Sequence, residues 1–204
     1  MAARLRETPV RTPSLTRLSR FTARFRRAER GVTAMEFALV SLPLMLMTFG
    51  LLELAMVFLA NVTLDNATYM AAREIRTGEF QTGSATAQSD FKSLVCTRMT
   101  WLNSRCATDL WVSVQTFASF ATLAASPSAN PITFNPITNP PCFSPGQPTD
   151  IVLVQTYFEW NLFTPLLNNA LENMGGGSGK RLLTSTTAFR NEPYNTNPPQ
   201  GAGC

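Results

Sequence analysis

The stretch that decides the fold runs from Phe37 to Ala60 and reads FALVSLPLMLMTFGLLELAMVFLA. Its 24 residues contain one ionisable side chain, that of Glu53, and no lysine or arginine lies between Arg30 and Arg73. A helix of this length measures about 36 Å, which exceeds the hydrocarbon core of a bilayer, about 30 Å thick. The stretch therefore predicts a membrane-spanning helix rather than the buried core helix of a soluble protein.

Charge is distributed unevenly around this stretch. Residues 1–30 hold nine arginines and two glutamates, a net charge of +7, whereas the rest of the chain has a net charge of −3. Positively charged flanks stay in the cytoplasm, so we expect a single-pass protein with a basic cytoplasmic leader over residues 1–31 and an exterior C-terminal part. A cleaved secretory signal is the competing interpretation, but the apolar run is longer than an ordinary h-region. Nucleic-acid binding is not expected, because the basic tail leads directly into an apolar run.

The composition argues against an enzyme. The chain has no histidine, which removes the usual general base and the commonest zinc and haem ligand. Its acidic residues are few and scattered, so neither a glycosidase-like carboxylate pair nor a magnesium cluster is expected. We therefore expect a protein that is not an enzyme and that uses no metal and no cofactor.

The basic stretch ends in Gly31, at the edge of the apolar run, and Glu36 follows five residues later. This junction resembles the processing site of type IV pilins and pseudopilins, in which a membrane-embedded prepilin peptidase cuts after the glycine. The resemblance implies cleavage between Gly31 and Val32, so that Glu36 becomes the fifth residue of the mature chain. Glycine suits such a site because, without a side chain, its extended backbone can approach the peptidase closely.

The Glu36 carboxylate is expected to act in assembly. A carboxylate in hydrocarbon is costly unless it is paired. Cleavage would leave an α-ammonium group on Val32 at the positive end of the helix, and this group, from the same or a neighbouring subunit, can pair with Glu36. The pair would recruit the subunit and set its register. The alternative is an ordinary anchor in which Glu36 lies at the headgroup level.

Glu53 is a second acid in the apolar stretch, about 25 Å beyond Glu36 along a helix. At about 100° per residue the two side chains point to different faces. Glu53 is expected to be embedded in the membrane, either protonated or facing a protein partner. The alternative is that it lies near the outer headgroups, and the sequence leaves its partner open.

Four landmarks in order resemble the TadE-like pseudopilins of tight-adherence (Tad, or Flp-type) pilus systems. They are ERGVTAMEFALV (29–40), FGLLE (49–53), AAREIRTG (71–78) and FRNEPY (189–194). The resemblance implies a minor pseudopilin, a structural or assembly subunit of a bacterial inner-membrane system for surface attachment. It also implies work with the major pilin, a second pseudopilin and the pilus secretion platform, and a head in the periplasm or outside the cell.

Two other classes of protein remain open at this stage. One is an unprocessed bitopic membrane protein whose exterior head binds a ligand or a polysaccharide. The other is an organelle-imported membrane protein with an arginine-rich transit peptide, which the composition of residues 1–30 fits. The later landmarks favour neither of them.

The helix is expected to continue beyond the membrane, as a transmembrane and extended helix over residues 32–76. Leu64, Ala67, Ala71 and Ile75 recur at helical spacing, and Gly78 and Gly83 follow as helix-ending residues.

Residues 77–204 are expected to form an exterior head, which makes the fold class α+β: a small antiparallel sheet with packed helices. The expected elements are a helix over 86–102, strands over 109–120, 150–160 and 182–189, and a short helix that Thr164 and Pro165 open and that runs to Met174. Residues 127–148 carry seven prolines and predict a loop.

All four cysteines, Cys96, Cys106, Cys142 and Cys204, follow the span, in the compartment expected to be exterior. An even number there predicts two disulfides, and four cysteines allow three connectivities. We favour Cys96–Cys106, which ties a helix end to the next loop, and Cys142–Cys204, which attaches the tail to the proline-rich loop. Zinc binding by four thiolates is disfavoured because no closely spaced Cys-x-x-Cys pair occurs.

Overall fold

The computed structural model describes residues 30–83, 87–126, 141–164, 167–175 and 177–194. The chain divides into two compact units, Met1–Phe49 and Gly50–Cys204, and each is described by itself. Within the expected leader and proline-rich loop, residues 1–29 and 127–140 lie outside the described part of the chain.

The described residues of the first unit are the N-terminal part of helix α2, which spans Arg30–Thr77. From Val32 to Phe49 most side chains are exposed, and the helix continues through Pro43. The hydroxyl groups of Ser41 and Thr48 donate hydrogen bonds to backbone carbonyls one turn earlier, at 3.2 and 2.8 Å. These polar groups are thus satisfied within the helix itself, as a lipid environment requires.

Helix α2 contains a segment that meets the requirements of a membrane span. Among the described residues it is the one helix long and apolar enough to cross a bilayer. Only 17% of its most apolar window is buried, whereas the core helix of a soluble protein would be mostly covered. The predicted apolar helix is therefore present.

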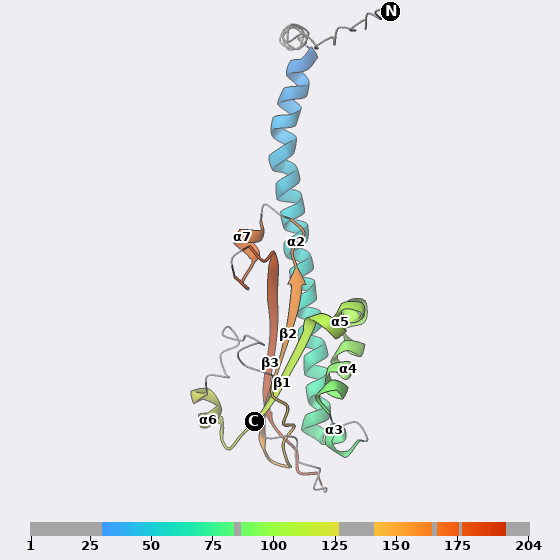
Figure 1. Ribbon diagram of the computed structural model, residues 1–204, viewed down its shortest axis with the longest axis vertical. Helices are drawn as coiled ribbons and strands as arrows, with labels where there is room; N and C mark the ends of the chain where they lie inside the picture. Colours follow the sequence, from blue (N-terminus) through green and yellow to red (C-terminus); the bar gives the residue numbers. More distant parts are fainter. Residues whose placement is uncertain (1–29, 84–86, 127–140, 165–166, 176, 195–204) are drawn as a thin grey trace, which may run out of the picture. The chain divides into compact units, whose positions relative to one another are not determined.

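The second unit contains a three-stranded antiparallel sheet in the order β1-β2-β3 (Figure 1). The strands are β1 (Leu110–Phe117), β2 (Ile151–Asn161) and β3 (Lys180–Arg190). The central strand β2 is buried along nearly its whole length because it has a strand on each side. The α+β class and the three strands expected from the sequence are confirmed.

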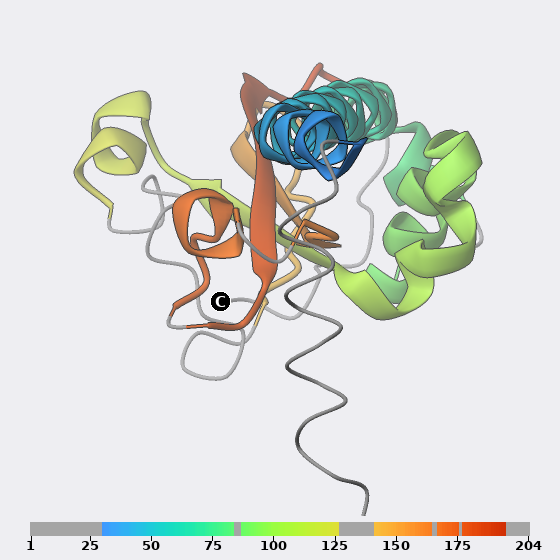
Figure 2. The same cartoon turned by 90° about the horizontal axis from the view of Figure 1, so that it is seen from above.

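Short helices surround the sheet. They are α3 (Glu79–Thr82), α4 (Gln88–Arg98), the 3-10 turn η1 (Thr100–Leu102), α5 (Asn103–Asp109), α6 (Phe120–Ala125) and α7 (Asn168–Leu171). Helices α4 and α5 lie at one side of the head, and α6 lies at the other (Figure 2). The helix expected to open at Thr164 is shorter than predicted, since α7 begins only at Asn168.

The C-terminal half of α2 belongs to the core of the head. Its buried side chains recur every three or four residues and are mostly alanines, which allow the sheet to approach closely. The apolar ones in the core are Ala60, Leu64, Ala67, Ala71, Ala72 and Ile75. The hydroxyl groups of Thr68 and Thr156 meet at 2.6 Å between helix and sheet. The second compact unit begins at Gly50, inside this helix.

Helix α2 ends where the sequence predicts. Gly78 follows its last residue with φ at +81°, a conformation that favours glycine. A Cβ atom at this position would also lie 2.5 Å from the ring of Tyr194. Both the backbone conformation and the close contact therefore require glycine here.

Candidate functional site

The Glu53 side chain is fully buried, with 0% of its surface exposed. The backbone N–H of Phe163 donates a hydrogen bond to its Oε1 at 2.7 Å, and the backbone N–H of Thr164 donates to its Oε2 at 3.1 Å. Both oxygens of this carboxylate therefore hold the loop that follows β2. We call this arrangement, Glu53 with the N–H groups of Phe163 and Thr164, the Glu53 clamp.

Gly50 supports the same contact one helical turn before Glu53. A Cβ atom at position 50 would lie 2.7 Å from Cδ1 of Leu167, which belongs to the same loop. Residues three apart share a helix face, so Gly50 makes room for the loop that Glu53 binds. The glycine and the glutamate of the FGLLE landmark thus have one role in this head, the attachment of the loop after β2 to α2.

Filling the space at Gly50 is expected to separate this loop from the helix. In Gly50→Leu the new side chain collides with Leu167, and overpacking of this kind costs about 1–3 kcal/mol of unfolding free energy. The double variant Gly50→Leu with Leu167→Ala moves the leucine to the other side of the contact and should recover most of the loss. Urea unfolding of the full chain in detergent measures both effects, and equal losses in the single and double variants would contradict this packing.

Gly31, Val32 and Glu36 lie in a different setting from Glu53. Arg30, Gly31 and Val32 are helical and form the start of α2. The Glu36 side chain is exposed and makes no ion pair with any described residue. The two acids therefore differ: the Glu53 carboxyl is buried and hydrogen-bonded within its own chain, whereas the Glu36 side chain is exposed.

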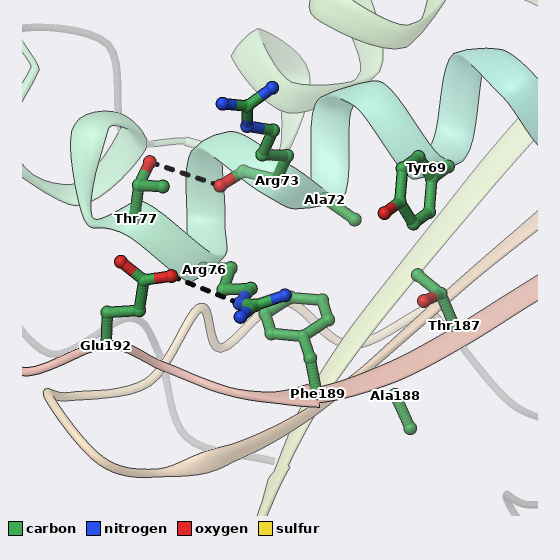
Figure 3. A pocket seen from close by; sticks show the side chains of 9 residues that line it. All are labelled: Tyr69, Ala72, Arg73, Arg76, Thr77, Thr187, Ala188, Phe189 and Glu192. Atoms are coloured by element: carbon green, nitrogen blue, oxygen red, sulfur yellow. Dashed lines mark hydrogen bonds and ion pairs between the residues drawn. The ribbon is translucent and has the colours of Figure 1, made fainter.

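The last two sequence landmarks meet in space (Figure 3). Nε of Arg76 lies 3.3 Å from Oε1 of Glu192, and the backbone N–H of Glu192 donates to the carbonyl of Arg76 at 2.9 Å. Tyr194 packs against Gly78, and its hydroxyl donates to the carbonyl of Gly146 at 3.3 Å. The AAREIRTG and FRNEPY segments are thus two sides of one structural contact at the end of α2.

A cavity of about 480 Å³ lies between this part of α2 and strand β3. Tyr69, Arg73 and Arg76 line it from the helix, and Phe189 and Glu192 line it from the other side. Figure 3 shows the guanidinium of Arg76 directed at Glu192 and that of Arg73 directed away from it. The cavity is the candidate ligand site of the head.

Cys96 and Cys106 form a disulfide that joins α4 to α5, the first pairing favoured from the sequence. Cys142 is also disulfide-bonded. Its expected partner, Cys204, lies outside the described residues.

The Cys96–Cys106 disulfide is expected to stabilise the head moderately. It closes a loop of ten residues, for which the chain-entropy effect is about 2–3 kcal/mol. The double variant Cys96→Ala with Cys106→Ala should lose about this much unfolding free energy and keep its fold, because the surrounding apolar core remains. Urea unfolding measures the loss, and an unchanged midpoint would contradict the expectation.

The titratable groups with altered pKa values are scattered over the head. Burial raises the pKa of Tyr157 to about 12 and also raises that of Tyr194. A hydrogen bond to Glu159, at 2.8 Å, raises the pKa of Lys180, and burial lowers that of Lys92. Within the described residues no three His, Cys, Asp or Glu side chains are grouped closely enough to hold a metal ion.

Residues 31–73 match the family model described as TadE-like protein. The match begins at the predicted cleavage junction and includes Glu36, Gly50 and Glu53. No curated protein and no solved structure matches the chain.

One apolar helix that is able to cross a membrane, followed by an α+β head, is consistent with a single-pass membrane protein. Over that helix the chain is similar to TadE-like proteins, consistent with a TadE-like protein of the Tad pilus system. The family suggests a pilus-associated protein, and its members are generally structural rather than catalytic.

Proposed function

We propose that this chain is a minor pseudopilin of a tight-adherence pilus system, a non-catalytic assembly subunit involved in surface attachment. The observation that carries the proposal is the family match over residues 31–73, which begins at Gly31 and covers the whole apolar helix. The exposed apolar side chains from Val32 to Phe49 support it, since they leave the first part of α2 free to pack against other apolar helices.

In the proposed function, Glu36 recruits this subunit to the growing pilus. The α-ammonium group released on Val32 lies at the positive end of α2, and a carboxylate in an apolar setting pairs strongly with such a group. The exposure of Glu36 supports pairing with another subunit rather than within this chain. The partners of the subunit are the major pilin, a second pseudopilin and the secretion platform.

Processing by the prepilin peptidase takes place after Gly31. The first turn of α2 includes Gly31, so the peptide bond must leave the helical conformation to enter the peptidase in extended form. Glycine makes this unwinding easier, because it lowers helix stability by about 1 kcal/mol relative to alanine. Gly31 therefore allows the peptidase to approach the backbone closely and also allows the first turn of α2 to unwind.

The head faces the periplasm or the exterior, and the N-terminus stays in the cytoplasm of a bacterial inner membrane. The nine arginines of residues 1–30 support this orientation. The Cys96–Cys106 disulfide supports it independently, because disulfides persist in oxidising compartments.

Co-expression tests the processing step. The chain is produced with and without a prepilin peptidase, alongside the variant Gly31→Val, and its size is followed on a gel. We expect a smaller product that appears only with the peptidase and only with Gly31 intact. A single product of unchanged size in all three samples would contradict the proposal.

The cavity beside Arg73 favours a second candidate, an unprocessed bitopic protein whose head binds a ligand. Under this alternative the chain keeps its leader in the presence of the peptidase. The pseudopilin function is then rejected, and the cavity becomes the site to study.

A further inference from the structure

The apolar stretch and the head overlap along α2. A hydrocarbon core about 30 Å thick takes about 20 helical residues. Counted from Phe37, the first residue after Glu36, such a span ends near Met56. The compact unit of the head begins at Gly50, about 10 Å of helix before that point.

The outward face of α2 also remains apolar past Gly50. Leu51, Leu54, Phe58 and Leu59 are exposed although they belong to the part of the helix that carries the head. Apart from the buried Glu53, polar residues after Gly50 begin only at Asn61. These exposed apolar side chains are more stable in contact with lipid acyl chains than with water, along the first turns of the second unit.

The described part of the loop after β2, residues 162–164 and 167–174, also carries apolar side chains. Phe163 and Met174 are exposed, and Leu162, Leu167 and Leu171 are half-buried. The Phe163 side chain is 58% exposed, although its own backbone N–H is bound to Glu53. A buried backbone that carries an exposed phenyl ring is suited to a surface that contacts lipid.

Two polar side chains of this loop form hydrogen bonds with neighbouring backbone, whereas the buried Oδ1 of Asn168 has no hydrogen-bond partner. Glu172 accepts hydrogen bonds from the N–H groups of Gly177 and Gly179, at 2.8 and 3.1 Å. Asn173 exchanges two hydrogen bonds with the backbone of Leu182. Together with the Glu53 clamp, these bonds lower the cost of placing the loop at a low-dielectric boundary.

From these observations we propose that the described part of this loop, residues 162–164 and 167–174, enters the outer boundary of the bilayer, with the Phe163 ring in contact with lipid. The inference rests on the proposed membrane topology and adds a second contact between the chain and the membrane. The head and the membrane span share about 10 Å of helix α2, from Gly50 to Met56. This length agrees with the depth of about 5–10 Å at which interfacial segments lie in a bilayer. In this arrangement the Glu53 clamp joins the two membrane-contacting segments, α2 and the loop.

Photo-crosslinking of the full chain tests the proposal. Benzoylphenylalanine replaces Phe163, or in the matched control Phe120, which is 54% exposed on α6. Each protein is reconstituted into vesicles of phosphatidylethanolamine and phosphatidylglycerol and irradiated, and lipid adducts are counted by mass spectrometry. Circular dichroism and the Cys96–Cys106 disulfide verify that both variants are folded.

We expect the probe at position 163 to form lipid adducts at least about tenfold more often than the probe at position 120. Equally low labelling at both positions would overturn the inference. Crosslinks from position 163 to a second protein subunit, without lipid adducts, would overturn it in favour of a subunit interface. Resistance to carbonate extraction is measured in parallel: if the chain is extracted, the proposed topology fails, whereas an inserted chain without lipid adducts refutes only this inference.

Discussion

Glu53→Ala is expected to destabilise the head by about 2–6 kcal/mol of unfolding free energy. The variant leaves the N–H groups of Phe163 and Thr164 without their acceptor, and each unsatisfied buried donor costs about 1–3 kcal/mol. Since small domains have a total stability of about 5–15 kcal/mol, this loss is a large share. Urea unfolding of the full chain in detergent, followed by circular dichroism, measures it.

Two further variants sharpen this prediction. Glu53→Gln keeps one acceptor oxygen but places an amide NH₂ group against the second N–H, so it should lose about half as much. Glu79→Ala removes an equal charge from an exposed position on α3 and should change stability by less than about 0.5 kcal/mol. If Glu53→Ala behaves like Glu79→Ala, the clamp does not hold the loop.

Unlike Glu53→Ala, the variant Glu36→Ala is expected to leave the stability of the chain unchanged and to reduce its assembly into pili. The side chain is exposed and forms no ion pair within the described part of the chain, so unfolding and membrane insertion should stay as in the parent protein. Incorporation into pili should fall by about tenfold or more, because loss of about 1.4 kcal/mol of pairing energy already has this effect. Quantitative blotting of sheared pilus and membrane fractions measures both quantities.

Glu36→Asp serves as the control for charge. It keeps a carboxylate in the same helical turn and should retain part of the incorporation that Glu36→Ala loses. Normal piliation in Glu36→Ala would refute the role of Glu36 in assembly. A loss of insertion would show instead that Glu36 acts in the anchor.

Much of the fold follows from periodicity in the sequence. The helical spacing of Leu64, Ala67 and Ala71 correctly extended α2, and Gly78 marked its end. The three strands lie within a few residues of their predicted bounds. The alternating pattern predicts a strand through residue 120, but Ser119 and Thr122 form a capping box that starts α6 instead.

The site was less predictable, because its interactions connect residues far apart in sequence. Thr164 was expected to cap a helix, but its N–H is bound by Glu53, 111 residues away, and α7 starts later. The donors to Glu53 are backbone groups, which leave no signature in the residue types of the loop. The FGLLE landmark contains Gly50 and Glu53, but only the fold identifies what these residues contact.

The N-terminus of the mature protein tests the central claim most directly. The full-length gene is expressed in cells that contain a prepilin peptidase, the protein is extracted from the membranes, and the intact chain and its N-terminal peptide are analysed by mass spectrometry. A processed TadE-like pseudopilin begins at Val32. A chain that still begins at Met1 would contradict the account and favour an unprocessed membrane anchor.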